Sequence, residues 1–214
     1  APLGADEVQA IFSKLDQLAL TRNHDGIAAM LAEEGDSVLL AVRMVKDETK
    51  EPFAGILGTG KNLDLRWLRP KDVGDNTLLN TDNTAGKGLY GGANAAIFSW
   101  LYPFVANTRA TIIPEQKMIE ESALVIFGAI DPVDIPKIEQ VDFTISGITG
   151  PGQSTPFNIR RGTATEDVPF VRFEKPIIIG PEKKFQVRVM PNITGDSKFQ
   201  LLAIIVAPAE LFVT

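Results

Sequence analysis

Residues 123–130 read ALVIFGAI, and residues 184–189 read KFQVRV. In the second stretch apolar and polar side chains alternate, which is the period of a β-strand with one buried face. The first stretch is apolar throughout, and this indicates a strand that is covered on both faces. The two stretches together predict a β-rich body with strands in both settings.

Further short apolar runs surround these two stretches between Asn107 and Val206. They comprise residues 110–113, 141–145, 157–159, 168–173, 177–179 and 199–206. Proline and glycine separate the runs, and short strands at a spacing of about 8–12 residues with such turn signals are typical of a sandwich or barrel. The sequence therefore predicts a mainly β fold, an antiparallel β-sandwich or jelly roll.

An N-terminal helical segment precedes this body. In Ala5–Thr21 apolar side chains recur at spacings of three and four, which is the period of an amphipathic helix. Asp6 and Glu7 favour the start of this helix through its dipole. A second short helix is expected at residues 25–34, ended by Gly35. Two interpretations of the apolar face of the first helix stay open: packing on the chain's own body, or packing on a neighbouring subunit.

The stretch Ser37–Val45 reads SVLLAVRMV and predicts a first strand. The following residues are rich in Gly, Asn, Asp and Thr, which predicts long loops, and a short helix is expected at residues 93–102. Loops of this length usually form functional surfaces or partner contacts. The expected organisation is an N-terminal helical arm over residues 1–35 and a β-sandwich (jelly-roll-like) body over residues 36–214, with long inserted loops at about 46–106.

Composition bounds the function. The 214 residues are 44% apolar and 22% charged, which is an ordinary globular balance. The net charge of −6 argues against strong nucleic-acid binding. The absence of cysteine excludes disulfides and thiolate metal sites. No apolar run approaches the ~20 residues of a transmembrane helix, and no signal peptide is recognisable at the start.

Histidine content excludes several enzyme classes. His24 is the only histidine, so the chain lacks the histidines of a β-barrel metalloenzyme, and His24 lies far in sequence from the β-rich body. Residues 55–62, GILGTGKN, resemble a phosphate loop, but Asn62 replaces the Mg²⁺-binding hydroxyl and a strand-like segment follows. Residues 86–91, GKGLYG, match G-x-G-x-x-G without a preceding strand. Both segments are interpreted as glycine turns, and no cofactor is expected.

Paired carboxylates are the remaining catalytic chemistry, because glycosidases need only two. Glu120 and Glu121 are adjacent, and on a strand they would point to opposite faces. Asp131 and Asp134 belong to a turn signature. A carboxylate-only hydrolase therefore remains as a third alternative. Acidic and amide side chains at residues 72–82 leave a structural cation open, although no EF-hand spacing is present.

The layout resembles the single jelly-roll capsid proteins of viruses. The features that carry the resemblance are the helix at 5–21, the long loops at 46–90 and the strand series at 107–206. The resemblance concerns architecture and covers most of the chain. It implies an N-terminal arm followed by about eight antiparallel strands. The arm here is not basic, in contrast to arms that package a genome, which favours a shell whose inner face meets a membrane or another protein.

The sequence therefore predicts a structural, self-assembling subunit of a viral or virus-like shell, located in the virion and not an enzyme. Its partners would be copies of itself, with other shell proteins or an internal membrane as further candidates. The alternative is an extracellular or cell-surface β-sandwich module that binds carbohydrate or mediates attachment through exposed aromatic side chains. The residues expected at subunit contacts are Val8, Ile11, Phe12, Leu15, Leu18, Trp67, Tyr90, Trp100 and Tyr102.

Overall fold

The structure, a computed structural model, describes residues 2–22, 25–54, 59–69, 72, 100–130, 137–145, 154–155 and 170–212. Its helices are α1 (Ala5–Arg22), α2 (Asp25–Glu33) and α3 (Gly35–Thr49). Its strands are β1 (Leu63–Trp67), β2 (Trp100–Phe104), β3 (Ala110–Lys117), β4 (Ala123–Ile130), β5 (Ile138–Ile145), β6 (Ser154–Thr155), β7 (Phe170–Ile179), β8 (Lys184–Pro191) and β9 (Gly195–Pro208). A short 3-10 helix, η4 (Ala209–Leu211), follows β9.

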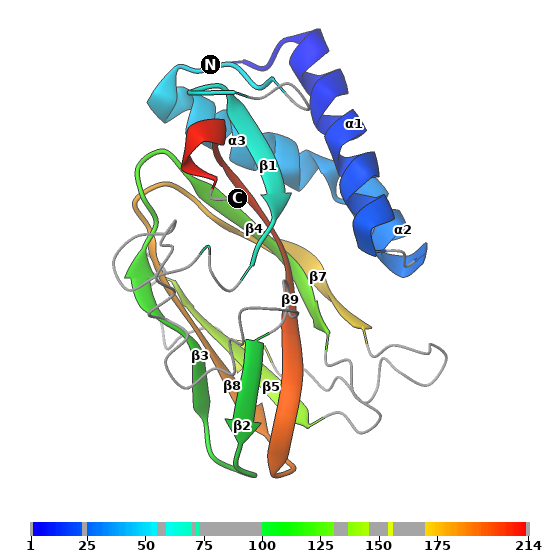
Figure 1. The fold of residues 1–214 in the computed structure, drawn as a ribbon, viewed down its shortest axis with the longest axis vertical. Coiled ribbons are helices and arrows are strands. Elements are labelled where there is room, and N and C mark those ends of the chain that lie inside the picture. Colours follow the sequence, from blue (N-terminus) through cyan, green and yellow to red (C-terminus); the bar gives the residue numbers. More distant parts are fainter. Residues whose placement is uncertain are drawn as a thin grey trace.

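The described strands form two antiparallel sheets, so the prediction of a mainly β fold is confirmed. The first sheet has the order β1-β9-β4-β7, with β2 also paired to β9, and the second has the order β3-β8-β5-β6. The helices lie together at one end of the molecule, over the first sheet (Figure 1). None of the described helices is long and apolar enough to cross a membrane.

The strand pairs are nested along the chain. The innermost pair is β5 with β6, enclosed in turn by β4 with β7, by β3 with β8, and by β1 and β2 with β9. Such nesting is that of one long antiparallel ribbon. The pairs β4–β9 and β5–β8 then join different parts of the ribbon into the two sheets.

β9 is the longest strand, and two separate segments pair with it along one side. β1 is in register with the C-terminal end of β9, where Trp67 lies opposite Ile204. β2 is in register with its N-terminal end, where Trp100 lies opposite Phe199. A single edge position of the sheet is thus filled by two pieces of chain, because β1 ends at Trp67 and β2 begins at Trp100 along the same side of β9.

β4 is covered on both of its faces, as its apolar sequence predicts. Leu124 and Ile126 join an apolar cluster with the second sheet. Val125 and Phe127 join another cluster with the helices. β9 alternates in the same way between the two clusters, so helices, first sheet and second sheet form successive layers. Replacing one such buried Leu, Ile or Phe by Ala would cost about 2–5 kcal/mol.

The strand expected at Ser37–Val45 is wrong, because these residues lie in α3. The buried side chains of this segment are Val38, Ala41, Val42 and Val45, whose spacings of three, one and three residues place them on one side of a helix. They pack in the same cluster as β4 and β9. The helical part of the chain therefore extends to Thr49, beyond the expected boundary at residue 35.

The region expected to hold long loops contains regular structure as well. Its described part includes the last turn of α3 and the strands β1 and β2. Trp100 to Tyr102, expected at the end of a short helix, lie in β2. The strand expected at 157–159, His24 and the segments 86–91 and 131–136 lie outside the described residues. Residues 170–173, the described part of the run expected at 168–173, and the run 177–179 belong to one strand, β7, which continues through Pro176.

Proline positions agree with the order of the strands. Pro103, Pro114 and Pro176 lie within β2, β3 and β7, and each of these strands is at an edge of its sheet in the described structure. Proline has no N–H to donate to a neighbouring strand, so edge strands are the positions that tolerate it. β3 also carries register shifts, which further disfavour pairing with a strand of another molecule.

Candidate functional site

The predicted contact residues on α1 occupy three different environments. Ile11, Leu15 and Leu18 are buried in the cluster that α1 shares with β1, β4 and β9. Val8 is half-buried, and Phe12 is 37% exposed. Packing on the chain's own body therefore accounts for most of the apolar face of α1. A contact of this helix with another subunit stays a prediction, and it would have to use Phe12 and its exposed neighbours.

The predicted aromatic contact residues are not gathered on one surface. Trp67 is 2% exposed and Trp100 is fully buried, in the two different apolar clusters. In this fold neither indole is available to a second molecule. Tyr102 lies in β2, with its side chain outside the described part, and Tyr90 is also outside it. The structure brings Phe12 together with residues that the sequence had not singled out.

An apolar groove runs between α1 and α2, with a volume of about 280 Å³. On the α1 side it is lined by Phe12, Leu15, Asp16, Ala19 and Leu20, and on the α2 side by Ala28, Leu31 and Ala32. The bulkiest exposed groups are Phe12 and Leu20, of which Leu20 is 80% exposed. Between Phe12 and Leu20 the lining consists partly of the small side chains of Ala19, Ala28 and Ala32, which leave the space of the groove open.

The floor at the Phe12 end depends on Gly35, the first residue of α3. A Cβ atom at this position would overlap the ring of Phe12, so only glycine allows the ring to lie where it does. Gly35 is followed by the exposed Asp36, and Asp16 is the charged residue among the groove's lining. Among the described residues no basic side chain lines the groove, so the charge that its described lining carries is negative.

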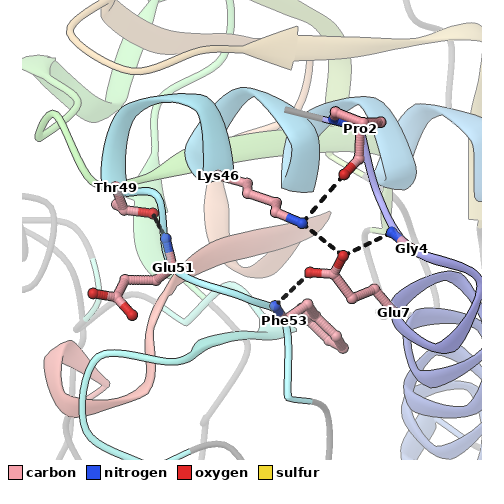
Figure 2. Close-up of polar contacts among 7 residues, drawn as sticks. All are labelled: Pro2, Gly4, Glu7, Lys46, Thr49, Glu51 and Phe53. Atoms are coloured by element: carbon pink, nitrogen blue, oxygen red, sulfur yellow. Dashed lines mark hydrogen bonds and ion pairs between the residues drawn. The ribbon is translucent and has the colours of Figure 1, made fainter.

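The N-terminal end of α1 is fixed by Glu7 (Figure 2). Glu7 Oε2 accepts hydrogen bonds from Lys46 Nζ at 2.6 Å and from the Gly4 amide at 2.8 Å. Its Oε1 accepts from the Phe53 amide at 3.0 Å, and Lys46 also donates to the Pro2 carbonyl. One carboxylate therefore connects α1, α3 and the segment that leads to β1.

The protonation state of Glu7 follows from these contacts. Partial burial acts to raise the pKa of Glu7. The hydrogen bonds from Lys46 and from the Gly4 and Phe53 amides outweigh that effect, so the pKa of the carboxyl is lowered. Glu7 is accordingly ionised at neutral pH, and it serves as a structural anchor.

The C-terminal end of α1 is fixed on β1 and β9. Trp67 Nε1 donates to the Leu18 carbonyl at 2.9 Å and to Thr21 Oγ1 at 3.2 Å. The guanidinium of Arg22 lies 4.8 Å from the centre of the Trp67 ring and donates to Gln200 Oε1. Burial lowers the pKa of Arg22 to about 10. Because α1 is held at both ends, its side of the groove is pre-organised.

α2 is held against the first sheet by charge. Arg172 on β7 forms ion pairs with Glu33 at 2.5 Å and with Glu34 at 2.6 Å. The hydrogen bonds that Arg172 donates to Glu34 and Glu33 raise its pKa above the usual value. The second side of the groove is thus positioned by contacts that do not involve α1.

The buried acids of the described structure are each paired with arginine. Asp72 lies 2.5 Å from Arg66 and 3.3 Å from Arg69, and Asp142 lies 3.1 Å from Arg109. Glu120 and Glu121 are exposed in a turn. Within the part of the chain that the structure describes, no group of side chains has the arrangement of a metal site. These ion pairs account for the burial of both acids.

Comparison with known proteins gives weak similarities. No protein-family model matches the chain, and no curated protein matches its sequence. Among solved structures, an insecticidal delta-endotoxin, Cry8Ea1, from Bacillus thuringiensis aligns over 69% of this chain and 24% of its own, with a TM-score of 0.35 and 10% identity. The VP2 subviral particle of infectious bursal disease virus aligns over 72% and 36%, with a TM-score of 0.32 and 9% identity. The chain spans about a quarter to a third of the length of these two proteins.

Six groove residues were not among the predicted contact residues: Asp16, Ala19, Leu20, Ala28, Leu31 and Ala32. The available signal was a leucine on α1 that does not belong to the buried face defined by Ile11, Leu15 and Leu18. A single exposed leucine is common on protein surfaces and carries little information by itself. Leu20 lines a groove only because α2 packs beside α1.

Proposed function

We propose that the chain is a jelly roll that serves as a structural subunit of a viral or virus-like shell. The observation that carries the proposal is the nested pairing of the strands. When β1 and β2 are counted as one interrupted strand, the described residues hold eight strands, and the pairs are first with eighth, second with seventh, third with sixth and fourth with fifth. This pairing supports a jelly roll, which has eight strands in two sheets.

The proposed function implies where the protein resides and what it binds. A shell subunit resides in the virion and associates with copies of itself and with other shell proteins. Proline in β2, β3 and β7 and the irregular pairing of β3 with β8 disfavour the addition of a further strand at these edges, which favours contacts through loops and helices. The acidic helical face, together with the net charge of −6, disfavours anionic lipid and nucleic acid as the main partners.

A carbohydrate-binding or attachment module is the second candidate, since jelly rolls also occur in lectins. It loses two of its expected binding residues, because Trp67 and Trp100 are buried. A carboxylate-only hydrolase is the third candidate. The buried acids Asp72 and Asp142 give it no support, since arginine neutralises each of them.

Size-exclusion chromatography with light scattering, followed by electron microscopy of any large species, tests the shell proposal. We expect rings, shells or tubes at high protein concentration. A monomer at all concentrations and salt conditions would contradict the proposal, and binding to a glycan array would then favour the attachment module. Point variants are preferable to removal of residues 1–22, because that removal would uncover the cluster around Ile11 and Leu15.

A further inference from the structure

We propose that the groove between α1 and α2 is a docking site for a cationic amphipathic helix from a different protein. This inference does not rest on the shell proposal. It rests on the shape of the groove, on the charge of its lining and on the contacts that fix its two walls.

The shape fits a helix better than a small molecule. The volume of about 280 Å³ lies just below the ~300–1,000 Å³ of pockets that enclose drug-sized ligands. Polar groups to orient such a ligand are also scarce, since Asp16 is the charged group of the lining. The groove follows α1 from Phe12 to Leu20, a length of about 12 Å at ~1.5 Å per residue. This length accommodates about two turns of a helix with apolar side chains at positions i, i+3 or i+4, and i+7.

The side chains of the groove leave room for a helix, and α1 is held in place before binding. Ala19, Ala28 and Ala32 let a helix approach closely, while Phe12 and Leu20 stand at the two ends as apolar contacts. α1 is held by Glu7 at one end and by its contacts with Trp67 at the other. A pre-organised groove loses little conformational entropy on binding, which favours affinity.

Charge selects the kind of helix. Asp16 is exposed on the groove wall, and Asp36 follows the glycine beneath Phe12. The lining that the structure describes holds no basic side chain to neutralise Asp16. An occupant with lysine or arginine beside its apolar stripe would pair with these carboxylates.

The same charge disfavours the other occupants. A second copy would bring the same described lining, which has Asp16 and no basic side chain, so it would offer no positive charge to pair with this carboxylate. A membrane-surface helix carries lysine and arginine on its polar face, whereas this surface is acidic. A cationic helix on another chain is the occupant that satisfies both the apolar floor and the acidic wall.

Fluorescence anisotropy with two labelled peptides of the length of α1 tests the proposal. Both peptides carry leucines at i, i+3, i+4 and i+7, with lysines flanking the stripe in one and glutamates in the other. We expect the full chain to bind the lysine peptide and to bind the glutamate peptide more weakly. Asp16→Lys should weaken the lysine peptide about two- to fivefold and strengthen the glutamate peptide. Glu121→Lys, an exposed change of equal charge in a turn between strands, should leave both affinities unchanged.

A second variant reports on the shape. Ala28→Trp fills the hollow, and we expect it to abolish binding of the lysine peptide while circular dichroism remains that of the parent chain. Equal affinity for the two peptides, no binding of either, or the same effect of Asp16→Lys and Glu121→Lys would overturn the proposal. Sedimentation equilibrium identifies the competing occupant: a dimer that Leu20→Glu abolishes would assign the groove to a second copy and overturn the proposal as well.

Discussion

Gly35 lies directly beneath the ring of Phe12, so the first residue of α3 supports an exposed aromatic side chain on α1. The two helices are connected in sequence through α2, and the contact closes one end of the groove. A side chain at position 35 would overlap the ring of Phe12, so the position of this ring requires glycine at position 35.

Gly35→Ala is expected to destabilise the chain by about 1–3 kcal/mol, because the added methyl group must displace the ring. The free energy of unfolding in urea measures the loss. The double variant with Phe12→Ala is the control. If the ring is the obstacle, Gly35→Ala costs much less in the Phe12→Ala background, and an equal cost in both backgrounds would refute the relationship.

The Glu7 anchor predicts a pH dependence with a defined sign. The folded chain holds the pKa of Glu7 below its ordinary value of 4.5, so its contribution is present above that pH and is lost as the pH falls through the folded pKa. We expect Glu7→Gln to cost about 1–2 kcal/mol at pH 7 and progressively less below pH 4.5. Urea titrations of both proteins across this range provide the test, and a constant difference would argue against the anchor.

The two tryptophans allow the layers to be followed separately. Trp67 reports on the cluster beneath the helices, and Trp100 on the cluster between the sheets. Because β4 and β9 contribute side chains to both clusters, we expect one cooperative transition. In Trp100→Phe and in Trp67→Phe, fluorescence and far-UV circular dichroism should therefore give the same midpoint. A Trp67 signal that changes before the dichroism would mean that the helices detach first.

Gln116 is 3% exposed on β3, and neither its amide nitrogen nor its oxygen has a hydrogen-bond partner in the structure. Burial of an unpaired amide is costly, so Gln116→Leu is expected to be neutral or to stabilise the chain by about 1–3 kcal/mol. Gln140→Leu is the matched control, because the Gln140 amide donates to Asp142 at 2.8 Å and its loss should destabilise. Thermal unfolding of the two variants distinguishes them, and a lower midpoint for Gln116→Leu would contradict the expectation.

The local sequence pattern predicted the secondary structure correctly where the spacing of apolar residues matches the faces that are buried in the fold. The limits of β4 coincide with the apolar run 123–130, and α1 extends only one residue beyond the expected helix. The strand predicted at Ser37–Val45 was wrong because a dense run of apolar and β-branched residues is also typical of a strand. The apolar residues Val38, Ala41, Val42 and Val45 nevertheless have helical spacing. This helix packs on a sheet face formed by β4 and β9. These strands are distant from α3 in sequence, so a local sequence pattern cannot predict the packing.

The groove could not be predicted for a related reason. Its walls belong to two helices, and its depth depends on how α2 lies beside α1, which the ion pairs of Arg172 with Glu33 and Glu34 help to fix. These partners are separated by more than a hundred positions in the chain. The sequence predicts Phe12 as a contact residue, but it does not indicate which neighbours surround its ring in the fold.

The interrupted edge of the first sheet has a consequence for how this chain can change in evolution. β1 and β2 each find their own register on β9, so neither depends on the other for alignment. Asp72 is fixed by Arg66 and Arg69, but the number of residues between Asp72 and Trp100 is not dictated by the sheet, and the entropy of closing such a connection grows only slowly with its length. Relatives of this chain can be expected to differ most in length here, and the same position would accept a foreign peptide for display without loss of the fold.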